Sequence, residues 1–312
     1  MTRVLDGIDA FLDQLGSVDF VPLILAVACH LLKMACTSRA WRNVLAAAYP
    51  DERVPWTSIY AAYLAGVGVN AIIPARAGDA VRIYLAHRAV RGSSYTTVIS
   101  STLVLSIFDV TAATLLLSWA IAIGALPGLD LLPRLEGFDF AFLLDRPLAF
   151  QLTLAAILVG FMILGVWVHG HVVDFWDRVR QAFSVLRSPT RYLRSVAAWQ
   201  AADWGLRLLT IWFLLDAFDI PQSLHNAALV QVSQSTATML PITPGGLGTE
   251  QAFLLYVLNG LAPAAVLLAF SVGARLTITT VNVIAGFTAI GITMRTFRYS
   301  KAMRPSGEAQ GS

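Results

Sequence analysis

The chain has 312 residues, of which 57% are hydrophobic and only 13% are charged, and its mean hydropathy is +0.67. The charged fraction is roughly half that of soluble domains, so the composition excludes the two soluble domains that the length alone would suggest. The net charge of +3 says less than the places where the charges lie. The sequence predicts an all-α polytopic membrane protein that binds no nucleic acid.

The chain begins with an acidic segment, residues 1–19, which predicts a weakly amphipathic helix outside the lipid. This segment lacks the basic region with which a cleavable signal peptide starts. The first spanning segment is expected at residues 20–37. It ends at a basic cluster formed by Lys33, Arg39 and Arg42.

Further apolar runs follow as far as residue 294. They cover residues 56–73, 95–126, 148–170, 196–218, 222–240, 251–261 and 264–294. A short charged helix is expected at 80–91 and an acidic loop at 127–147. The transmembrane domain is therefore expected at 20–295, before a tail at 296–312 that is first basic and then disordered.

The distribution of charge predicts which parts face the cytoplasm, because loops rich in lysine and arginine stay on that side. The basic segments are 33–53, 76–91, 178–194 and 295–304, and the acidic ones are 1–19, 127–147 and 216–219. The carboxyl terminus is therefore expected in the cytoplasm and the amino terminus outside the inner (cytoplasmic) cell membrane.

Two basic segments, 39–53 and 76–91, flank the apolar run at 56–73 and would lie on opposite sides if that run crossed the membrane. We therefore expect residues 56–91 to form a re-entrant helical hairpin from the cytoplasm, and residues 222–261 to form one from outside. The fold is then a helical bundle with two inverted repeats, at 20–126 and 196–294, joined by a linking span at 148–170. The alternative is that every apolar run spans the membrane.

Each hairpin contains a break with proline and glycine, and the two breaks match. Aligning Pro74 with Pro244 places Gly78 on Gly248 and Asp79 on Thr249. Both Asp79 and Thr249 are expected to cap the helix that follows. Matched breaks in the two halves of a membrane protein are typical of a transporter's substrate site.

Arg76 is the charge at the first break that capping does not explain, because a cation gains nothing from a helix N-terminus. A guanidinium beside free N–H groups would instead bind a phosphate. Asp79 also has the simpler role of capping. The substrate-binding residues expected here are Asn70, Pro74, Arg76, Gly78, Asp79 and Arg82.

The glycines of the second break could bring backbone N–H groups to an anionic ligand, or they could serve only a close helix–helix contact. Glu250 suits the dipole at the start of its helix without any function, and it could also carry a coupling proton. The substrate-binding residues expected here are Pro244, Gly245, Gly246, Gly248, Thr249 and Glu250.

Four more ionisable residues lie inside apolar runs, where charges usually face a bundle interior or a cavity. They are Asp109, Asp203, Arg207 and Arg275, and we count them with the substrate site. Asp203 and Arg207 have the spacing of a helical ion pair. Asp109 and Arg275 need partners on other helices, and each other is one choice. The sequence shows no metal constellation, nucleophile–base pair or nucleotide fingerprint, so we expect no cofactor, no metal and no catalytic residue.

These residues resemble the transmembrane domain of the lysylphosphatidylglycerol synthase family, known from the multiple peptide resistance factor. Asn70–Arg82 follows the family pattern N-x-x-x-P-x-R-x-G-[DE], and Pro241–Glu250 follows P-x-x-P-G-G-x-G. Ala40–Leu45 lies near a tryptophan–arginine motif. Leu105 and Ser106 stand where many members carry Glu-Arg, and the additional first helix of many members is expected to be missing.

The resemblance implies movement of an anionic, aminoacylated or polyprenyl-linked lipid between leaflets, by a flippase-like translocase. The alternative is a membrane-embedded lipid-modifying transferase or an accessory subunit that presents lipid to one. The expected partner is the membrane lipid itself, with either a second copy of the chain or a lipid-synthesis enzyme beside it.

The re-entrant hairpin can be tested with single cysteines at Arg53 and Arg88, in a chain whose own 2 cysteines are replaced. Both positions flank the hairpin, so a membrane-impermeant reagent should label both from the same face. Labelling from opposite faces would show that residues 56–91 cross the membrane.

Arg76→Ala is expected to abolish lipid translocation in vesicles without loss of folding, and Arg76→Lys to restore it only in part, because an ammonium lacks the bidentate fork that fits a phosphate. If Arg76 only balances Asp79, then Arg76→Ala with Asp79→Asn should recover activity. Wild-type rates for Arg76→Ala alone would contradict the phosphate role.

Overall fold

The computed structural model describes residues 16, 18–73, 76–125, 177–239 and 248–302, and its regular elements in these ranges are helices. The chain divides into two compact units, 1–126 with 182–312 and 127–181. Only 177–181, which are helical, are described in the smaller unit. The linking span predicted at 148–170 lies outside the described residues, as do Pro74, Pro244, Gly245 and Gly246.

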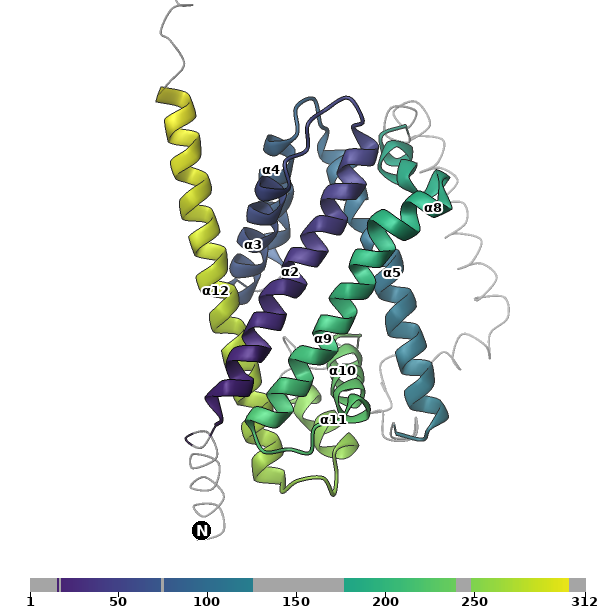
Figure 1. Ribbon diagram of the computed structural model, residues 1–312, viewed down its shortest axis with the longest axis vertical. Coiled ribbons are helices and arrows are strands. Elements are labelled where there is room, and N and C mark those ends of the chain that lie inside the picture. The colour runs from purple at the N-terminus through teal and green to yellow at the C-terminus, as the bar shows by residue number, and fades with distance from the viewer. Residues whose placement is uncertain (1–15, 17, 74–75, 126–176, 240–247, 303–312) are drawn as a thin grey trace, which may run out of the picture. The chain divides into compact units, whose positions relative to one another are not determined.

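Two antiparallel helices, α2 (Phe20–Ala48) and α9 (Ala198–Ala217), lie side by side in the larger unit (Figure 1). At one end the backbone N–H of Asp19 donates to the carbonyl of Ala217 at 3.0 Å. At the other end the side-chain amide of Asn43 donates to the carbonyl of Ser195 at 2.6 Å. The two helices are therefore tied together at both ends.

Helix α2 is longer than predicted. The expected end at residue 37 was wrong, because no helix breaker occurs before Pro50 and the basic residues in this stretch are good helix formers. Lys33 is therefore a mid-helix residue and not part of a terminal cluster. This difference matters for the site described below.

The hairpin predicted at 56–91 is present as α3 (Trp56–Ile72) and α4 (Ala77–Ala89). Its entrance lies at the carboxyl end of α2, where the Trp56 indole donates to the Ser38 hydroxyl at 3.0 Å. Its return is fixed to the same end by the N–H of Ser94, which donates to the Tyr49 hydroxyl at 3.0 Å. Both ends of the hairpin therefore contact the carboxyl-terminal half of α2.

The second hairpin consists of α10 (Leu224–Met239) and α11 (Thr249–Val257). The first turns of α10 and the end of α11 pack in one hydrophobic cluster with Ala26 and the end of α9. This cluster lies at the amino end of α2, opposite the entrance of the first hairpin (Figure 1). The two hairpins thus enter the bundle from opposite ends. A two-fold relation between the repeats stays a prediction.

Two long helices complete the unit, α5 (Tyr95–Ala122) and α12 (Ala264–Ala302). Among the described residues, three helices are long and apolar enough to cross a membrane: α2, α5 and α12 through Thr293. Because α12 runs on to Ala302, the tail expected from residue 296 starts as helix. The basic stretch before α9 forms short helical pieces, which are η2 (Phe183–Arg187), α8 (Pro189–Tyr192) and η3 (Leu193–Ala197).

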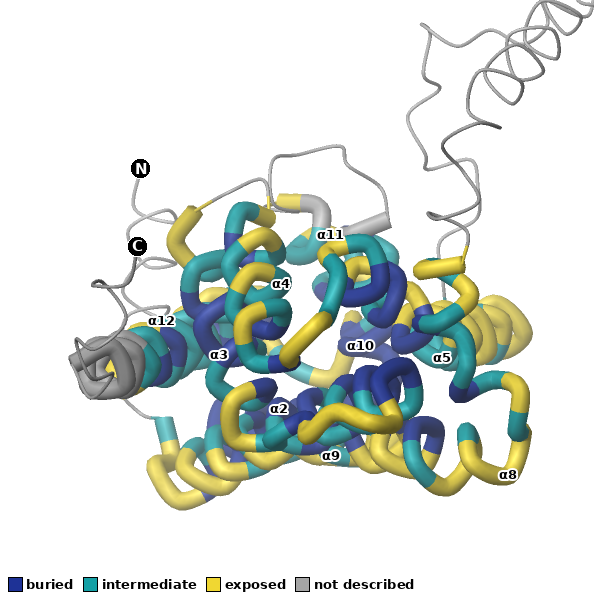
Figure 2. The backbone as a smooth tube through the Cα atoms, turned by 90° about the horizontal axis from the view of Figure 1, so that it is seen from above, coloured by how far each residue is buried: buried dark blue, intermediate teal, exposed yellow. Residues whose placement is uncertain are grey.

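Large apolar residues are exposed along α5 and α12, while α2, α9 and α10 carry many buried residues (Figure 2). The outward ones include Leu103, Val110 and Leu115 on α5 and Leu276, Ile284 and Ile292 on α12. Such a surface is unfavourable in water and suits contact with acyl chains. The protein is therefore a membrane protein with several apolar helices.

Glycines allow the backbone of α3 to come into direct contact with the backbones of α4 and α12. A Cβ placed on Gly286 of α12 would lie 2.5 Å from the Cα of Gly68 in α3. A Cβ on Gly78, in the first turn of α4, would clash with the carbonyl oxygen of Gly66. Small residues at such crossings are a common means of helix packing within membranes.

Gly286→Ala should lower the thermal stability of the protein in detergent, because the added methyl group must separate α3 from α12 at a cost of about 1–3 kcal/mol. Gly291→Ala, in the same helix, is the matched control because nothing lies within 4 Å of its added Cβ. The control should be neutral or slightly stabilising, since alanine favours a helix over glycine. Equal melting temperatures for the two variants would contradict the close contact.

Candidate functional site: a polar cavity between α2, α9 and the second hairpin

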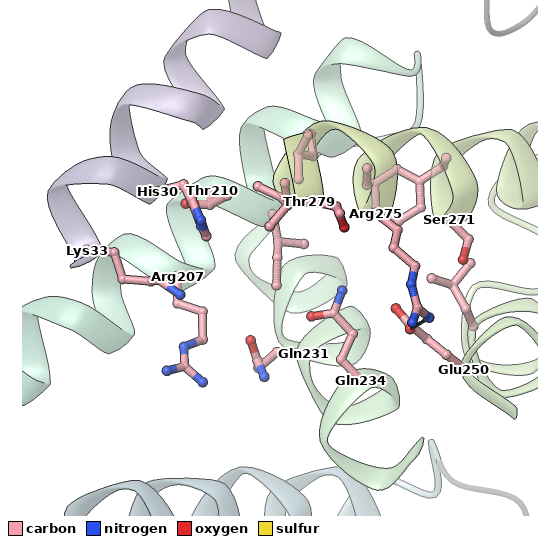
Figure 3. Close-up of a pocket in the computed structure, with 16 residues that line it drawn as sticks. His30, Lys33, Arg207, Thr210, Gln231, Gln234, Glu250, Ser271, Arg275 and Thr279 are labelled. Carbon is pink, nitrogen blue, oxygen red and sulfur yellow. Dashed lines mark ion pairs between the residues drawn. The ribbon is translucent and has the colours of Figure 1, made fainter. Parts of the chain in front are cut away.

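A cavity of about 340 Å³ lies between α2, α9, α10, α11 and α12. Most of the side chains that line it are polar, although the outward face of the bundle is apolar (Figure 3). The polar ones are His30, Lys33, Arg207, Thr210, Gln231, Gln234, Glu250, Ser271, Arg275 and Thr279. Polar groups gathered inside a membrane bundle are the usual mark of a polar ligand's site.

Lys33 and Arg207 form one end of the cavity. Lys33 extends from α2 toward the Arg207 side chain on α9 (Figure 3). The Arg207 guanidinium donates from Nη2 to Asp203 Oδ2 at 3.1 Å and lies 4.7 Å above the ring of Trp204. Its Nε is buried and has no hydrogen-bond partner in the described part of the chain.

Asp203 holds Arg207 in place. Its side chain is only 2% exposed, and besides the ion pair it accepts a hydrogen bond from the Thr37 hydroxyl at 2.6 Å. The helical ion pair predicted from the spacing of Asp203 and Arg207 is therefore confirmed. Because Thr37 lies one turn beyond Lys33 on α2, this carboxylate also fixes α9 against α2 at the level of the cavity.

Glu250 and Arg275 lie at the other end of the cavity, where they form an ion pair of 3.5 Å between α11 and α12 (Figure 3). The suggestion that Arg275 pairs with Asp109 is therefore wrong. Asp109 instead accepts a hydrogen bond from the Trp204 indole at 2.9 Å. Both residues do have partners on other helices, as the cost of a lone charge in lipid requires.

The start of α11 is fixed by Gln251 and not by Thr249. Gly248 occupies the capping position with φ of 87°, a conformation that glycine adopts easily. Its N–H donates to Gln251 Oε1 at 2.7 Å, and the Gln251 amide donates to the Ser271 hydroxyl of α12 at 3.1 Å. Thr249 is the first residue of the helix, so the cap predicted there was wrong by one position.

Gln231 brings an unsatisfied amide to the cavity. The residue is only 4% exposed, and its Nε2 donates to the Ser235 hydroxyl at 3.1 Å. Its Oε1 is buried and has no partner among the described residues. Exchanging the two ends of the amide would leave an N–H₂ there instead. In either orientation one polar group lacks a hydrogen-bond partner. Because a buried unsatisfied polar group costs about 1–3 kcal/mol, a ligand that bonds to it would gain free energy.

His30 connects α2 with α12 at the edge of the cavity. Its Nε2 lies 2.8 Å from Asn282 Oδ1, and the residue is 6% exposed. On the far side of this hydrogen bond an apolar groove of about 570 Å³ runs between α2, α3 and α12. Leu31 and Val281, the neighbours of the bonded pair in sequence, line this groove. The polar cavity and the apolar groove therefore share two walls.

The tip of the first hairpin forms a separate polar cluster that does not line the cavity. Asn70 donates from Nδ2 to Asp79 Oδ1 at 3.0 Å and accepts from the N–H of Gly78 at 2.8 Å. Arg82 pairs with Asp79 at 3.4 Å and lies 5.9 Å from the ring centre of Trp41. Asn70 thus joins the two arms of the hairpin.

Arg76, and not Asp79, takes the capping position of α4, so the predicted cap was wrong. The helix begins at Ala77, which places Asp79 in its first turn, and Arg76 has a positive φ of 58°. The Arg76 side chain is exposed. Because the Asp79 carboxylate is held by Asn70 and Arg82, it is not the counterion of Arg76.

The structure thus separates the predicted site residues into groups. Of the predicted site residues that the structure describes, Arg207, Glu250 and Arg275 line the cavity, and Asp203 forms an ion pair with Arg207. Sequence reasoning missed Lys33, Gln231, Gln234 and Ser271 as site residues. The available signal was Lys33 itself, a lysine inside an apolar run in a chain whose only other lysine is Lys301. The glutamines carried no such signal.

The arrangement can hold an anion and hydrogen-bonding groups together within a membrane bundle. The described residues contain no cluster of potential metal ligands. Cations at one end, amides and a hydroxyl along the wall, and an apolar groove next to them suit an amphiphile with a polar headgroup.

Comparison with known proteins gives one match. The pattern that describes the lysylphosphatidylglycerol synthase TM region matches residues 4–286, which is most of the chain. No curated protein matches the sequence. The chain therefore belongs to the lysylphosphatidylglycerol synthase transmembrane-region family.

Proposed function

We propose that the protein is a lipid translocase, which carries a lipid headgroup between leaflets through the polar cavity. The observation that supports this most is the cavity itself, because it places Lys33, Arg207 and the Glu250–Arg275 pair within a bundle whose outer surface is apolar. Charges at such a position are costly, and in membrane proteins they usually mark a substrate or ion pathway. The family's name also points to membrane lipids.

The apolar groove supports a lipid over a soluble solute. The groove and the cavity share α2 and α12 as walls, and the His30–Asn282 hydrogen bond joins these two helices. A headgroup in the cavity would leave its acyl chains in the groove or in the surrounding bilayer. Burial of each CH₂ group of such a chain is worth about 0.8 kcal/mol, which a small polar solute cannot gain.

The two hairpins support movement across the membrane over static binding. They enter from opposite ends of α2, and the second one contributes Gln231, Gln234 and Glu250 to the cavity. Broken helices that enter from opposite sides and meet near the midplane are the usual framework of alternating access.

The test is a reconstituted vesicle assay with a phospholipid labelled on its acyl chain, in which a membrane-impermeant reductant measures the label that reaches the outer leaflet. The protein should increase the transfer rate over protein-free vesicles. In the double variant Arg207→Gln, Asp203→Asn the rate should fall about tenfold or more, since a hydrogen bond to a charged group is worth about 1.5–3 kcal/mol.

The double change is used because removing one partner of a buried pair would leave the other uncompensated and endanger folding. Arg91→Gln is the matched control, since Arg91 is exposed in the turn after α4 and does not line the cavity. Melting temperatures confirm that each variant is folded. A wild-type rate equal to that of empty vesicles would refute the proposal.

A further inference from the structure

Among the described residues, Lys33 is the cavity-lining charge without an ion-pair partner. The ion pairs of the described residues join Arg207 to Asp203 and Arg275 to Glu250, and none of them includes Lys33. Residues 240–247, which connect α10 and α11 in the sequence, include no charged residue and so no carboxylate. Asp109, an acid group on α5, does not line the cavity and accepts a hydrogen bond from the Trp204 indole.

The charged groups of the cavity therefore have a net charge of +1 when the ion pairs are included. The lining residues Lys33, Arg207 and Arg275 carry three positive charges. Two negative charges come from Glu250, which also lines the cavity, and from Asp203, which is paired with Arg207. A ligand that carries one negative charge would complete the balance. A ligand with a net positive charge would increase the imbalance in a region where charges are poorly screened.

The donors at the Lys33 end suit a phosphodiester. Lys33 offers its ammonium group and Arg207 offers the buried Nε–H that has no described partner, and Figure 3 shows the two side chains at the same end of the cavity. A phosphodiester carries one negative charge and two free oxygens that can accept both donors. The unpartnered Nε–H is the second observation, independent of the charge balance, that points to an acceptor there.

The opposite end suits uncharged hydroxyl groups. Gln234 lies beside the Glu250–Arg275 pair and Ser271 adds a hydroxyl, while Gln231, which leaves one polar atom unpaired, lies between this end and Arg207 (Figure 3). This end is neutral overall and offers both donors and acceptors. An ammonium group would find the carboxylate of Glu250 already paired with Arg275.

We infer that the cavity selects anionic phosphodiester lipids with an uncharged, hydroxyl-bearing headgroup, rejects aminoacylated lipids whose headgroup is net cationic, and uses Lys33 as the residue that sets this choice. The inference rests on the proposed translocation for its biological meaning, but the selectivity is a property of binding. Members of this family are named for a lysyl lipid, so the charge of this cavity separates the present chain from that substrate class.

Binding and transport are measured separately, with trace amounts of acyl-chain-labelled phosphatidylglycerol and of its lysyl ester in vesicles of constant composition. The wild-type protein should bind phosphatidylglycerol at least tenfold more tightly than the lysyl ester. Lys33→Gln should reduce this ratio to near one, and Lys33→Glu should invert it. Arg91→Gln, which removes the same charge far from the cavity lining, should leave the ratio unchanged.

Equal binding of both lipids by the wild type, or a ratio that both Lys33 variants leave unchanged, would overturn the inference. If Lys33→Glu does not fold, Lys33→Gln still decides the outcome, because a neutral side chain of similar length is well tolerated in a helix. Selective binding without any transfer between leaflets would refute the translocase and leave the selectivity intact. Transfer of both lipids at equal rates and with equal affinities would refute the selectivity and leave the translocase intact.

Discussion

The cost of placing a charge inside a membrane bundle controls the arrangement of this protein. Asp203 is almost fully buried and is held by Thr37 of α2 and Arg207 of its own helix, so one carboxylate fixes two helices and one cation. Glu250 and Arg275 do the same for α11 and α12. Since an isolated charge at the bilayer centre costs about 2.5–3.5 kcal/mol even on the lenient scale, these pairs allow the cavity to be polar at all.

Close backbone contacts at glycines are the second constraint on how the helices pack. Gly68 against Gly286 and Gly66 against Gly78 bring α3 against α12 and α4 closer than any other residue would permit. The first hairpin is therefore packed tightly along its length and closed at its tip by Asn70. The second hairpin differs, because α10 and α11 leave polar side chains facing an open volume.

Much of the fold could be predicted because hydropathy and breakers reveal where helices lie. The ranges of α3, α5, α10 and α12 follow from apolar runs, and the two hairpins follow from proline and glycine breaks flanked by like charges. The end of α2 could not be predicted, since basic residues that look like a boundary are also good helix formers. The predicted caps were wrong by a few residues because Gly248 and Arg76 cap their helices with a positive φ, which a pattern of polar capping residues does not reveal.

The site was predicted in part. Intramembrane charges are visible in a sequence, but Gln231 and Gln234 are recognised as site residues only when five helices surround one cavity. The Asn70–Arg82 motif, which carried the resemblance, contributes nothing to the lining of that volume.

The hydrogen bonds toward the two ends of α2 distinguish two parts of the cavity wall, one formed by α2 with α9 and one formed by the second hairpin. Because α2 and α9 are joined at Asp19–Ala217 and again at Asn43–Ser195, sliding one along the other would require both joints to break together. The second hairpin packs at its open end in the cluster around Ala26, and at the start of α11 Glu250 and Gln251 contact Arg275 and Ser271 of α12. Lys33 and Arg207 therefore lie on two helices that are joined at both ends, whereas Gln231, Gln234 and Glu250 lie on the second hairpin. A ligand in the cavity would therefore contact cationic side chains on the joined helices α2 and α9, and amide side chains on the second hairpin.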